Sequence, residues 1–429
     1  MEKNRTKRTL TEGRFASGRS ASTTESRLPQ VLREGRRALR ELVLANGLRV
    51  FAEMLEEDRT LLCGPRHRPS PDRRAYRHGH DEGRLVFGGR KIRLQKPRVR
   101  TVTGEEIELP TWREMAGEDP LRDRVVEQLL LGVSSRGYEG SLEPLPEEVP
   151  SRGTRRSSVS RHFLARTAEQ TQSFLSRSLE GLDLPVILLD GTHLGDHVLL
   201  VAMGIDTTGH KHILGVAVGT TESEQVCRSL FRNLIDRGLV VERARLFVID
   251  GGKGLRKAIR MTFGEWAVVQ RCQIHKLRNV AEHLPQHRQA WVKSALRQAW
   301  KLGTEAKARH RLEQLAAQLD SDHPDAAASI REGLDETLTV IRLGLGGWLL
   351  KTLRSTNPIE NLQGTIQRIV RNVKRWRGGA MALRWCVTAL IEAEKRFRRV
   401  KGHREMPQLL AALEVLVSKN GLDTKKEVA

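Results

Sequence analysis

The sequence predicts an α/β protein built on a mixed sheet, and three observations lead to this class. Residues 184–272 contain five short apolar runs bounded by turn residues, which is typical of buried strands. The first three runs follow one another directly, whereas the last two each come after an amphipathic helical pattern. The chain on either side of this segment shows mostly helical patterns. We therefore expect a sheet of mixed orientation with helices packed on it.

The composition indicates a basic protein of the cell interior. The chain has 429 residues, enough for two or three domains, and a formal net charge of +22. A protein this basic usually binds polyanions, although a generally solvated basic surface is the alternative. It shows no signal-peptide pattern and no apolar run near the roughly 18 residues of a membrane span, and its scattered cysteines fit a reducing compartment. We expect a soluble, intracellular protein that binds nucleic acid and no membrane.

The first 180 residues carry the patterns of a DNA-binding region. Residues 1–30 are polar and rich in Arg, Ser and Thr, which predicts a disordered basic tail. The patterns that follow predict, in chain order, a helix at 31–60, a loop at 64–82, an alternating small sheet at 84–108, and helices near 119–138 and 154–180. We expect residues 31–180 to form a mostly helical region, with a small β segment, for DNA binding and dimerisation.

Two segments of this region are candidates for direct DNA contact. The run RKIRLQKPRVR at 90–100 is typical of a phosphate-contacting β segment, or of a strand edge kept solvated by its charge. The run SSVSRHF at 157–163 could begin a recognition helix of a helix-turn-helix, with Ser157 or Ser158 as its cap and Arg161 on DNA. A generic amphipathic helix is the alternative interpretation of the second run.

Strands and helices can be assigned more closely after residue 184. The predicted strands are VILLD, VLLVAMGID, HILGVAVGT, RLFVID and AVVQRC, and the helices between them are ESEQVCRSLFRNLIDRGL, ending at Gly238, and GLRKAIRMTF. From residue 274 to about 350 only helical patterns occur. A long helix is expected from Asn357 to about Arg399, with an interruption at Gly378 and Gly379.

Three carboxylates stand where a buried acid needs compensation. Asp190 ends the run PVILLD, Asp250 ends RLFVID, and Glu360 opens the helix that begins in STNPIENLQG. A buried acid is costly unless its charge is compensated, and sites in open sheets form beyond the carboxyl ends of strands. Mg²⁺ prefers such oxygen ligands, and a pair of ions can activate an attacking oxygen and stabilise a leaving oxygen. The pattern therefore predicts a metal-dependent site that acts on nucleic acid.

Glu360 also has a structural interpretation. Asn357, Pro358 and Glu360 fit positions N-cap, N1 and N3, so Glu360 could be the acid of a capping box. At about 100° per residue, Glu360 heads a basic stripe that continues through Gly364, Gln367, Arg371 and Lys374. Such a stripe suits a metal ligand whose helix then follows a phosphate backbone, and it is also ordinary amphipathic patterning.

Four motifs occur in order between Leu184 and Arg399: LDGTHL, FVIDGGKGL, QRCQIHKLRNV and LRSTNPIEN. Together they resemble the motifs of Mutator-type bacterial insertion-sequence transposases, and a weaker resemblance extends over residues 84–180. In that family an Asp–Asp–Glu triad on a ribonuclease-H-like fold binds two Mg²⁺ ions, with Mn²⁺ as a substitute. By motif, the resemblance implies that Asp190, Asp250 and Glu360 are the catalytic and metal-binding triad.

The resemblance also implies a domain layout. The ribonuclease-H-like catalytic core would comprise residues 181–273 and 351–400, an all-helical insertion would occupy residues 274–350, and residues 401–429 would be a C-terminal tail. The sequence departs from the family pattern at His193, where an aromatic residue is commoner, and in the helix after Glu360, which is more basic.

The implied activity is cutting of insertion-sequence ends and joining of the freed 3′-hydroxyl to target DNA. Its partners would be double-stranded DNA, both the terminal inverted repeats of the element and the target, and the protein would act as a homodimer or higher oligomer. Two alternatives stay open: a ribonuclease-H-like structure-selective nuclease, and a non-catalytic DNA-binding regulator derived from a transposase. Besides Arg161, the candidate nucleic-acid-binding residues are Lys253, His275, Lys276, Arg354, Asn357, Arg368, Arg371, Lys374 and Arg375.

Cys272 and His275 match a C-x2-H motif of the same family. They could form half of a zinc site that His283 and His287 complete, or Cys272 could be buried while His275 contacts phosphate or the surroundings of the metal ligands. Trp348 could stack on a base, although a core position is commoner for tryptophan in a helical region. Two tyrosines are few for a tyrosine recombinase, and GGKGL lacks the first Gly and the Ser/Thr of a P-loop.

Overall fold

The computed structural model describes residues 28–68, 73, 75–116, 120–145, 149–219 and 223–427. The chain divides into two compact units. The first comprises residues up to 88 together with 92–117 and 142–150, and the second comprises 89–91, 118–141 and the chain from 151 onward. The disordered tail predicted for residues 1–30 falls almost entirely outside the described residues. Within the described residues, no helix has both the length and the apolar character needed to cross a membrane.

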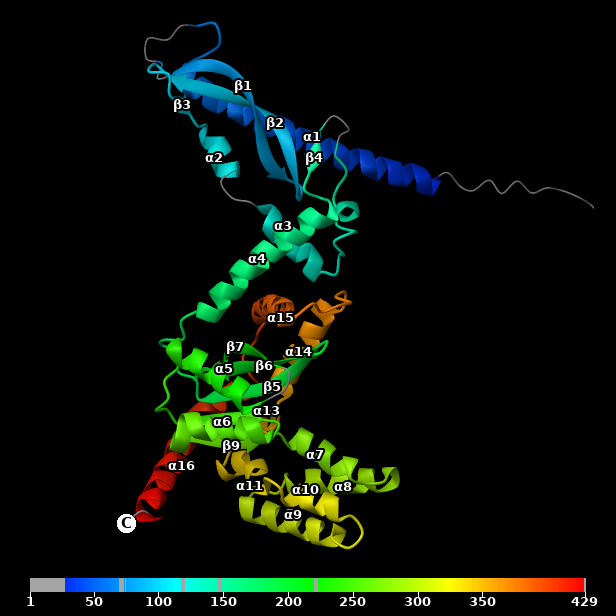
Figure 1. Cartoon of the computed structure of the whole chain (residues 1–429), viewed down its shortest axis with the longest axis vertical. Helices are drawn as coiled ribbons and strands as arrows, with labels where there is room; N and C mark the ends of the chain where they lie inside the picture. The colour runs from blue at the N-terminus through cyan, green and yellow to red at the C-terminus, as the bar shows by residue number, and fades with distance from the viewer. Residues whose placement is uncertain are drawn as a thin grey trace, which may run out of the picture. The chain divides into compact units, whose positions relative to one another are not determined.

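The first unit packs a long helix against a small sheet (Figure 1). Helix α1 (Leu28–Cys63) confirms the helix predicted at 31–60. The other elements are β1 (Ala75–Phe87), β2 (Arg90–Thr101), β3 (Glu106–Ile107) and α2 (Pro110–Ala116). The core between them contains Leu55 of α1, Leu85 of β1 and Trp112 of α2.

Strand β1 begins inside the segment 64–82, for which the loop prediction was wrong from Ala75 onward. Strands β1 and β2 are neighbours in the sheet, and Gly88 and Gly89 between them have φ values of 57° and 79°. Positive φ at both positions of a two-residue turn matches the twist of a hairpin, and glycine adopts it without strain. The pattern hid this strand because residues 78–82 are all exposed instead of alternating.

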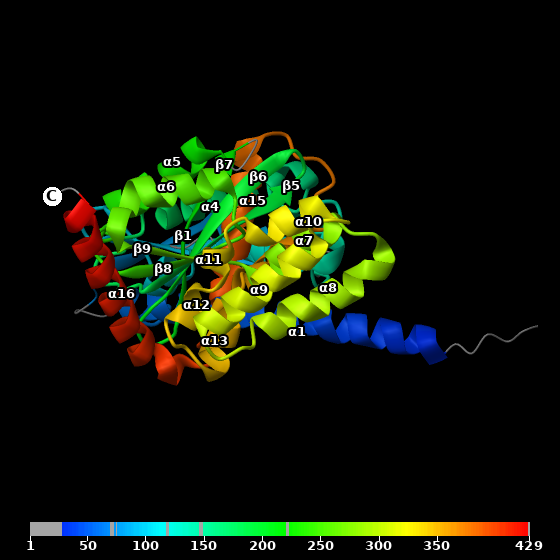
Figure 2. The same ribbon diagram turned by 90° about the horizontal axis from the view of Figure 1, so that it is seen from below.

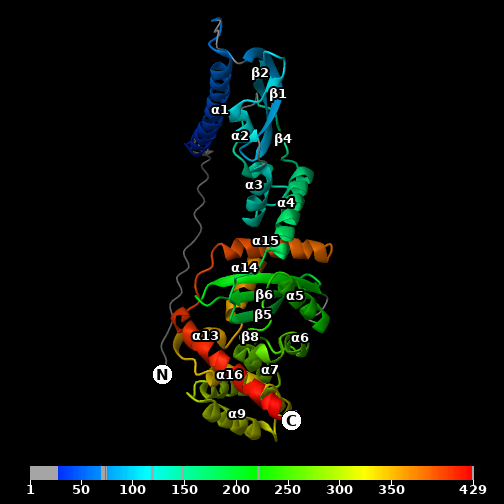
Figure 3. The ribbon, with the colours of Figure 1, turned by 90° about the vertical axis from the view of Figure 1, so that its left-hand side faces the viewer.

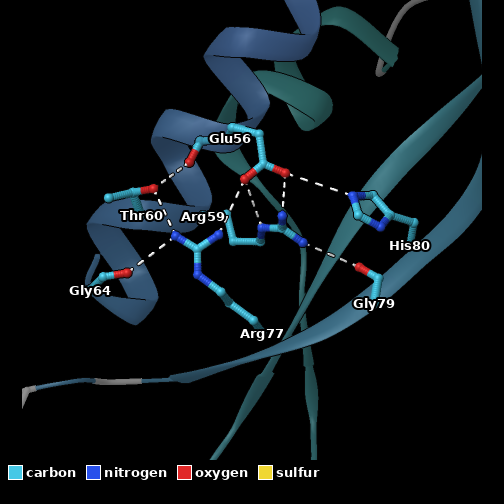
Figure 4. A network of polar contacts seen from close by, with 7 residues as sticks. All are labelled: Glu56, Arg59, Thr60, Gly64, Arg77, Gly79 and His80. Carbon is cyan, nitrogen blue, oxygen red and sulfur yellow. Dashed lines mark hydrogen bonds and ion pairs between the residues drawn. The ribbon is translucent and has the colours of Figure 1, made fainter. Parts of the chain in front are cut away.

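A polar network connects α1 to β1 (Figure 4). The Glu56 carboxylate on α1 accepts hydrogen bonds from Arg59 Nε at 3.0 Å and from Arg77 Nη1 at 3.2 Å. Arg77 also donates to Thr60 Oγ1 at 2.9 Å, and Arg59 donates to the Gly79 carbonyl oxygen at 3.3 Å. Because Arg59 is only 5% exposed, its charge depends on Glu56 for compensation.

A five-stranded sheet forms the centre of the second unit, and its mixed orientation confirms the coarse fold class. The strand order is β7-β6-β5-β8-β9. Strands β5 (Val186–Leu194), β6 (His197–Ile205) and β7 (Lys211–Gly219) pair antiparallel, whereas β8 (Arg245–Ile249) and β9 (Ala267–Arg271) continue the sheet parallel to β5. Each of the five strands overlaps the apolar run that predicted it, although β5 continues beyond its run.

Alternate residues of the sheet face two different cores. Ile187 and Leu189 of β5 belong to the core formed with α5 (Glu224–Asp236) and α6 (Lys253–Phe263), two helices that lie side by side (Figure 2). Their neighbours Val186 and Leu188 belong to the larger core on the opposite face. Both faces of the sheet are therefore covered, which explains why its strands are continuous apolar runs.

Two helices of the second unit precede the sheet in the chain: α3 (Pro120–Leu130) and α4 (Arg156–Ser176). Helix α4 packs on α15 (Gly379–Glu394), where the Phe163 and Trp385 ring centroids are 4.5 Å apart. The predicted cap at Ser157 or Ser158 is wrong, because α4 starts at Arg156 and its N-cap, Arg155, makes no side-chain cap bond. The shorter elements are strand β4 (Ser151–Arg152) and the 3₁₀ turns η1 (Glu139–Ser141), η2 (Gly264–Trp266) and η3 (His403–Glu405).

Every regular element described between β9 and residue 353 is a helix, which confirms the helical patterns expected there. The elements are α7 (Gln273–Glu282), α8 (Gln286–Ala299), α9 (Glu305–Leu319), α10 (Pro324–Arg331), α11 (Leu334–Thr337), α12 (Thr339–Arg342) and α13 (Gly347–Leu353). Their apolar faces belong to the same large core as Val186 and Leu188, which joins them firmly to the sheet.

The helical segment expected from Asn357 to about Arg399 is interrupted at Gly378 and Gly379 as predicted, but the break begins earlier: α14 (Asn357–Val370) ends before it, and α15 starts at Gly379. Within the intervening stretch the Trp376 side chain packs on Gly195, where an added Cβ would lie 2.6 Å from Trp376 Cδ1. A final helix, α16 (Met406–Glu427), buries Met406, Leu409 and Leu413, so the segment 401–429 contributes to the core.

Candidate active site

Asp190 lies on β5, and Asp250 follows the neighbouring parallel strand β8. The pairing of these two strands extends to Leu188 and Val248, and each aspartate stands two residues further along its chain. Because adjacent strands are separated by about 4.8 Å, the backbones at the two aspartates lie next to one another at the carboxyl end of β8. Asp250 follows the end of β8, as expected.

The expectation that Asp190 ends its strand is wrong. Strand β5 continues to Leu194 because its other edge remains paired with β6, with Asp190 opposite Val201. Asp190 therefore lies mid-strand, at the point where β8 no longer covers β5, and is 8% exposed. The strand holds this carboxylate more rigidly than a loop would.

The backbone after each aspartate is shaped around its carboxylate. The Gly191 N–H donates to Asp190 Oδ1 at 3.1 Å, and the Gly252 N–H donates to Asp250 Oδ1 at 2.9 Å. Gly251, which lies between Asp250 and Gly252, has a φ of 106°, and an added Cβ there would lie 2.1 Å from Arg271 Nε. Both the conformation and the close approach of Arg271 require glycine there.

Glu360 comes from the first turn of α14, a helix that lies beside the sheet (Figure 3). Two amide side chains fasten this helix to β5. Gln363 Nε2 donates to the Gly191 carbonyl oxygen at 2.8 Å, and Gln367 Nε2 donates to the His193 carbonyl oxygen at 2.8 Å. One face of α14 therefore lies along the part of β5 that begins at Asp190. The chain thus brings its third carboxylate to the same edge of the sheet across a long separation in sequence.

The capping interpretation of this helix start needs correction. Thr356, and not Asn357, is the N-cap of α14, and no side-chain cap bond forms. The Glu360 carboxylate accepts a hydrogen bond from Thr356 Oγ1 at 3.1 Å. Sequence reasoning missed Thr356, although a hydroxyl residue directly before Asn-Pro is a recognisable signal for a helix start. Glu360 is therefore oriented by Thr356 and does not serve as a capping-box acid.

Cys272 and His275 meet the same threonine. Cys272 is fully buried at the start of α7, and its Sγ accepts from Thr356 N at 3.4 Å and lies 3.3 Å from Thr356 Oγ1. His275 Nδ1 lies 3.3 Å from Thr356 Oγ1 and 3.8 Å from Glu360 Oε1. The hydroxyl carries one proton, so it can donate to Cys272 or to Glu360 at one time, and it can accept a hydrogen bond from His275 when that ring nitrogen is protonated.

The charges of this cluster follow from its contacts. Burial alone would raise the pKa of the Cys272 thiol, but hydrogen bonds from His275 and Thr356 outweigh burial and lower it. The bond to Cys272, together with the charges of Cys272, Asp190 and Glu360, raises the pKa of His275 to about 9 against the effect of its own burial. These contacts favour the protonated form of His275, which lies 3.8 Å from Glu360.

The zinc site suggested by the sequence does not form. His283 is the C-cap of α7 and His287 lies in α8, so the two do not share a helix, and both are exposed. Among the residues that the structure describes, the set of three ligand atoms that lie within 4.8 Å of one another comes from Cys272, His275 and Glu360. This set offers one sulfur, one nitrogen and one oxygen atom, from residues that already contact one another. It matches Mg²⁺ less well than a set of carboxylate oxygens would.

The candidate DNA-binding residues have contrasting environments. Lys276 is 1% exposed and its ammonium bonds the Ser329 carbonyl and lies 3.5 Å from Glu332, so it is placed for packing and not for contact with DNA. Burial, with the charge of Arg271, lowers the pKa of Lys276 to about 8. Arg354 and His275 are half-buried, whereas the exposed candidates are Arg161, Lys253, Asn357, Arg368, Arg371, Lys374 and Arg375.

The end of α14 corrects the proposed basic stripe. Arg371 is the C-cap of α14 and Lys374 lies beyond it, so neither continues the helical face headed by Glu360. Trp348 is 54% exposed instead of buried, and the Lys351 and Lys401 ammonium groups lie 4.5 Å and 4.8 Å from its ring centroid. The commoner core interpretation of Trp348 is therefore wrong.

These observations define a mixed α/β protein that presents three acids at one edge of its sheet within a strongly basic chain. Residues 24–400 match the family described as "Transposase, Mutator family", and the chain belongs to that family. The family predicted from the four motifs is thus confirmed. A transposase family is a family of DNA-processing enzymes.

Several relatives are similar over most of their length. The "Transposase for insertion sequence element ISRM5" of Rhizobium meliloti is 27% identical over 390 residues, covering 87% of this chain and 94% of the relative. The "Transposase for insertion sequence element IS256 in transposon Tn4001" of Staphylococcus aureus is 26% identical over 338 residues, 74% of this chain and 81% of the relative. The "Transposase for insertion sequence element IS6120" of Mycolicibacterium smegmatis is 27% identical over 288 residues, 66% of this chain and 85% of the relative.

Proposed function

We propose that this protein is a metal-dependent DNA transposase that cuts insertion-sequence ends and joins the freed 3′-hydroxyl to target DNA. The observation that carries the proposal is the approach of Asp190, Asp250 and Glu360 to one edge of the sheet in a chain of a transposase family. Three antiparallel strands followed by two parallel ones support a ribonuclease-H-like core. Helices α7 to α13, which separate Asp250 from Glu360 in the chain, would be its helical insertion.

The three carboxylates fit a pair of Mg²⁺ ions, with Mn²⁺ as a substitute, because they offer hard oxygen donors from three rigid elements. When bound, two such ions would activate an attacking oxygen and stabilise the leaving oxygen of a phosphodiester. Asp190, Asp250 and Glu360 would hold the ions, since β5 contacts both β8, which precedes Asp250, and α14, which carries Glu360.

The surrounding residues would orient these ligands and the DNA. The Gly191 amide orients Oδ1 of Asp190, and the Gly252 amide orients Oδ1 of Asp250. The Thr356 hydroxyl holds Glu360. The exposed cations Lys253, Arg368, Arg371, Lys374 and Arg375, with Arg354, would neutralise the phosphates of the bound strand. Residues 31–180 would bind the element ends and pair subunits in a dimer or higher oligomer.

The test uses the purified full chain and a duplex that contains one element end, taken from the inverted repeats expected to border the reading frame. With Mg²⁺ the protein should nick this duplex at the end and join the 3′-hydroxyl to a second DNA. Asp190→Ala, Asp250→Ala and Glu360→Ala should each lower cleavage at least about 1000-fold and leave affinity for the duplex within about twofold. Asp320→Ala, which removes an exposed carboxylate paired with Arg331, should cleave normally.

Two results would overturn this proposal in different ways. Release of cut ends without joining indicates the structure-selective nuclease. Binding without Mg²⁺-dependent nicking indicates the non-catalytic regulator.

A further inference from the structure

A groove of about 710 Å³ opens beside the candidate active site, within the second unit. Its walls come from the end of α3, one face of α14 and the end of α15 with the residues that follow it. The turn after α3 is held there because Asn372 Nδ2 donates to the Gly132 carbonyl oxygen. The volume is in the range of sites that enclose a small organic ligand.

The groove combines an apolar lining with a cationic one. Its apolar side chains include Leu130, Leu131, Leu362, Ile369 and Phe397. Leu131 is 72% exposed, so apolar surface is left facing solvent in this groove. Lys211, Arg368, Arg371, Lys395 and Arg396 also line it, against two acids, Glu127 and Glu392. Glu392 is already paired with Lys395 at 2.9 Å and with Arg396 at 3.3 Å, so the groove as a whole favours an anion with apolar parts.

Helix α14 links this groove to the site of the acids. Glu360, Gln363 and Gln367 share the face that meets β5, whereas Asn361, Thr365 and Arg368 line the groove. Asn361 follows Glu360 directly, and consecutive helical residues are rotated by about 100°. The face of α14 that lines the groove therefore adjoins the face that carries Glu360, and a DNA strand held at Glu360 would lie next to the groove.

The chemistry distinguishes between forms of DNA. A duplex presents phosphates to a protein but keeps its bases stacked, so it would meet the cations and leave the apolar lining uncovered. An unpaired nucleotide offers an anionic phosphate and a base with two apolar faces, which is what this lining matches. We propose that the groove binds an unpaired nucleotide of the DNA strand next to the cleavage site. This inference rests on the proposed function for its substrate, because it assumes that α14 contacts DNA.

The test measures binding without cleavage, with the full chain in EDTA. The probes are a fluorescein-labelled blunt 20-base-pair duplex and the same duplex with a three-nucleotide single-stranded thymidine extension. The wild-type protein should prefer the extended probe by at least about fivefold, since stacking of one base is worth about 1–3 kcal/mol. Thr365→Trp, which fills the groove, and Leu131→Asp, which puts a negative charge on its apolar lining, should bring this ratio close to one.

Matched controls separate the groove from general effects. Thr365→Ser leaves the groove open, and Val240→Asp adds the same charge to an apolar residue that is 61% exposed and does not line the groove. Both should keep the preference, and all variants should bind the blunt duplex within about twofold of wild type. Equal wild-type binding of the two probes, or a preference that survives both groove variants, overturns the proposal.

The groove variants could instead change the oligomeric state of the protein and leave its preference for the extended probe unchanged. That result would also overturn the proposal and would assign the groove to a second copy of the chain. Because the assay needs neither cleavage nor metal, it can fail while Mg²⁺-dependent cutting and joining succeed. The opposite result, a preference for the extended probe without Mg²⁺-dependent cutting and joining, is equally distinguishable.

Discussion

Two glutamates in the two units show how the same side chain serves different purposes. Glu56 in the first unit and Glu360 in the second both project from helices and are partly exposed, by 43% and 25%. Glu56 is bonded by two guanidinium groups that compensate its charge locally. Glu360 is bonded by a hydroxyl and lies close enough to Asp190 for both to act on His275. The protein therefore neutralises one acid with its own arginines, whereas the other belongs to the group of acids that the proposed metal ions would neutralise.

The largest effect expected from this comparison concerns Asp250. Asp250→Asn keeps the shape of the side chain and removes the charge, so cleavage should fall at least about 1000-fold. The unfolding temperature without metal should stay the same or rise, because one member of a group of like charges is lost. Mg²⁺ should raise the unfolding temperature of the wild type and not of the variant. Cleavage assays and calorimetry with and without Mg²⁺ check these outcomes.

An unfolding temperature that falls in Asp250→Asn while the Mg²⁺ effect persists would mean that Asp250 is a structural acid like Glu56. The acids of the two units would then not differ in purpose at Asp250.

The next effect concerns the hydroxyl that orients Glu360. Thr356 is fully buried, and Thr356→Val replaces its hydroxyl with a methyl group of similar size. Loss of groups that orient metal ligands typically lowers activity about 10–100-fold. We expect such a decrease in cleavage, with a higher Mg²⁺ concentration needed for half-maximal rate, and recovery in Thr356→Ser. An unchanged Mg²⁺ requirement would show that Thr356 only fills space.

The main elements of the second unit could be predicted because their signals are local. Each strand of the sheet is an apolar run of its own, and helices such as α5 carry a strong amphipathic pattern, with Cys227, Leu230 and Leu234 on the buried face. The aspartates could be chosen because they follow such runs. The family motifs then pointed to Glu360, whose helix start alone favoured a structural role.

What the sequence could not give depends on contacts between distant residues. Trp376, beyond the end of α14, packs on Gly195, and β5 extends as far as its pairing with β6. Arg271 resembles any basic residue at the end of a strand, yet it is buried against Gly251 and bonded to Glu332. No local pattern carries this information, because the partners are far apart in the chain.

A smaller effect is expected in the first unit. Glu56→Gln leaves the buried Arg59 without its carboxylate partner, which should lower the free energy of unfolding by roughly 1–3 kcal/mol. The matched control is Glu53→Gln on the same helix, where the pair with Arg49 is exposed and worth less than about 0.5 kcal/mol. Chemical denaturation monitored by hydrogen exchange in α1 measures both. Equal effects of the two substitutions would remove the distinction between the buried network and an ordinary surface pair.

The smallest expected effect is the pH dependence of the stability difference between wild type and Glu56→Gln. Burial alone would raise the pKa of Glu56, but hydrogen bonds and charges from Arg59 and Arg77 outweigh it and hold the pKa below its ordinary value of 4.5. A carboxyl whose pKa is lowered by folding stabilises the protein fully above its ordinary pKa and loses this contribution as the pH falls through the lowered one. The stability difference between wild type and Glu56→Gln should therefore be constant from neutral pH to about 5 and shrink at lower pH. His80 Nε2 lies 3.7 Å from Glu56, so both proteins should also carry His80→Gln to exclude its titration. A difference that persists unchanged at pH values well below 4.5 would show that the network depends on the shape of Glu56 and not on its charge.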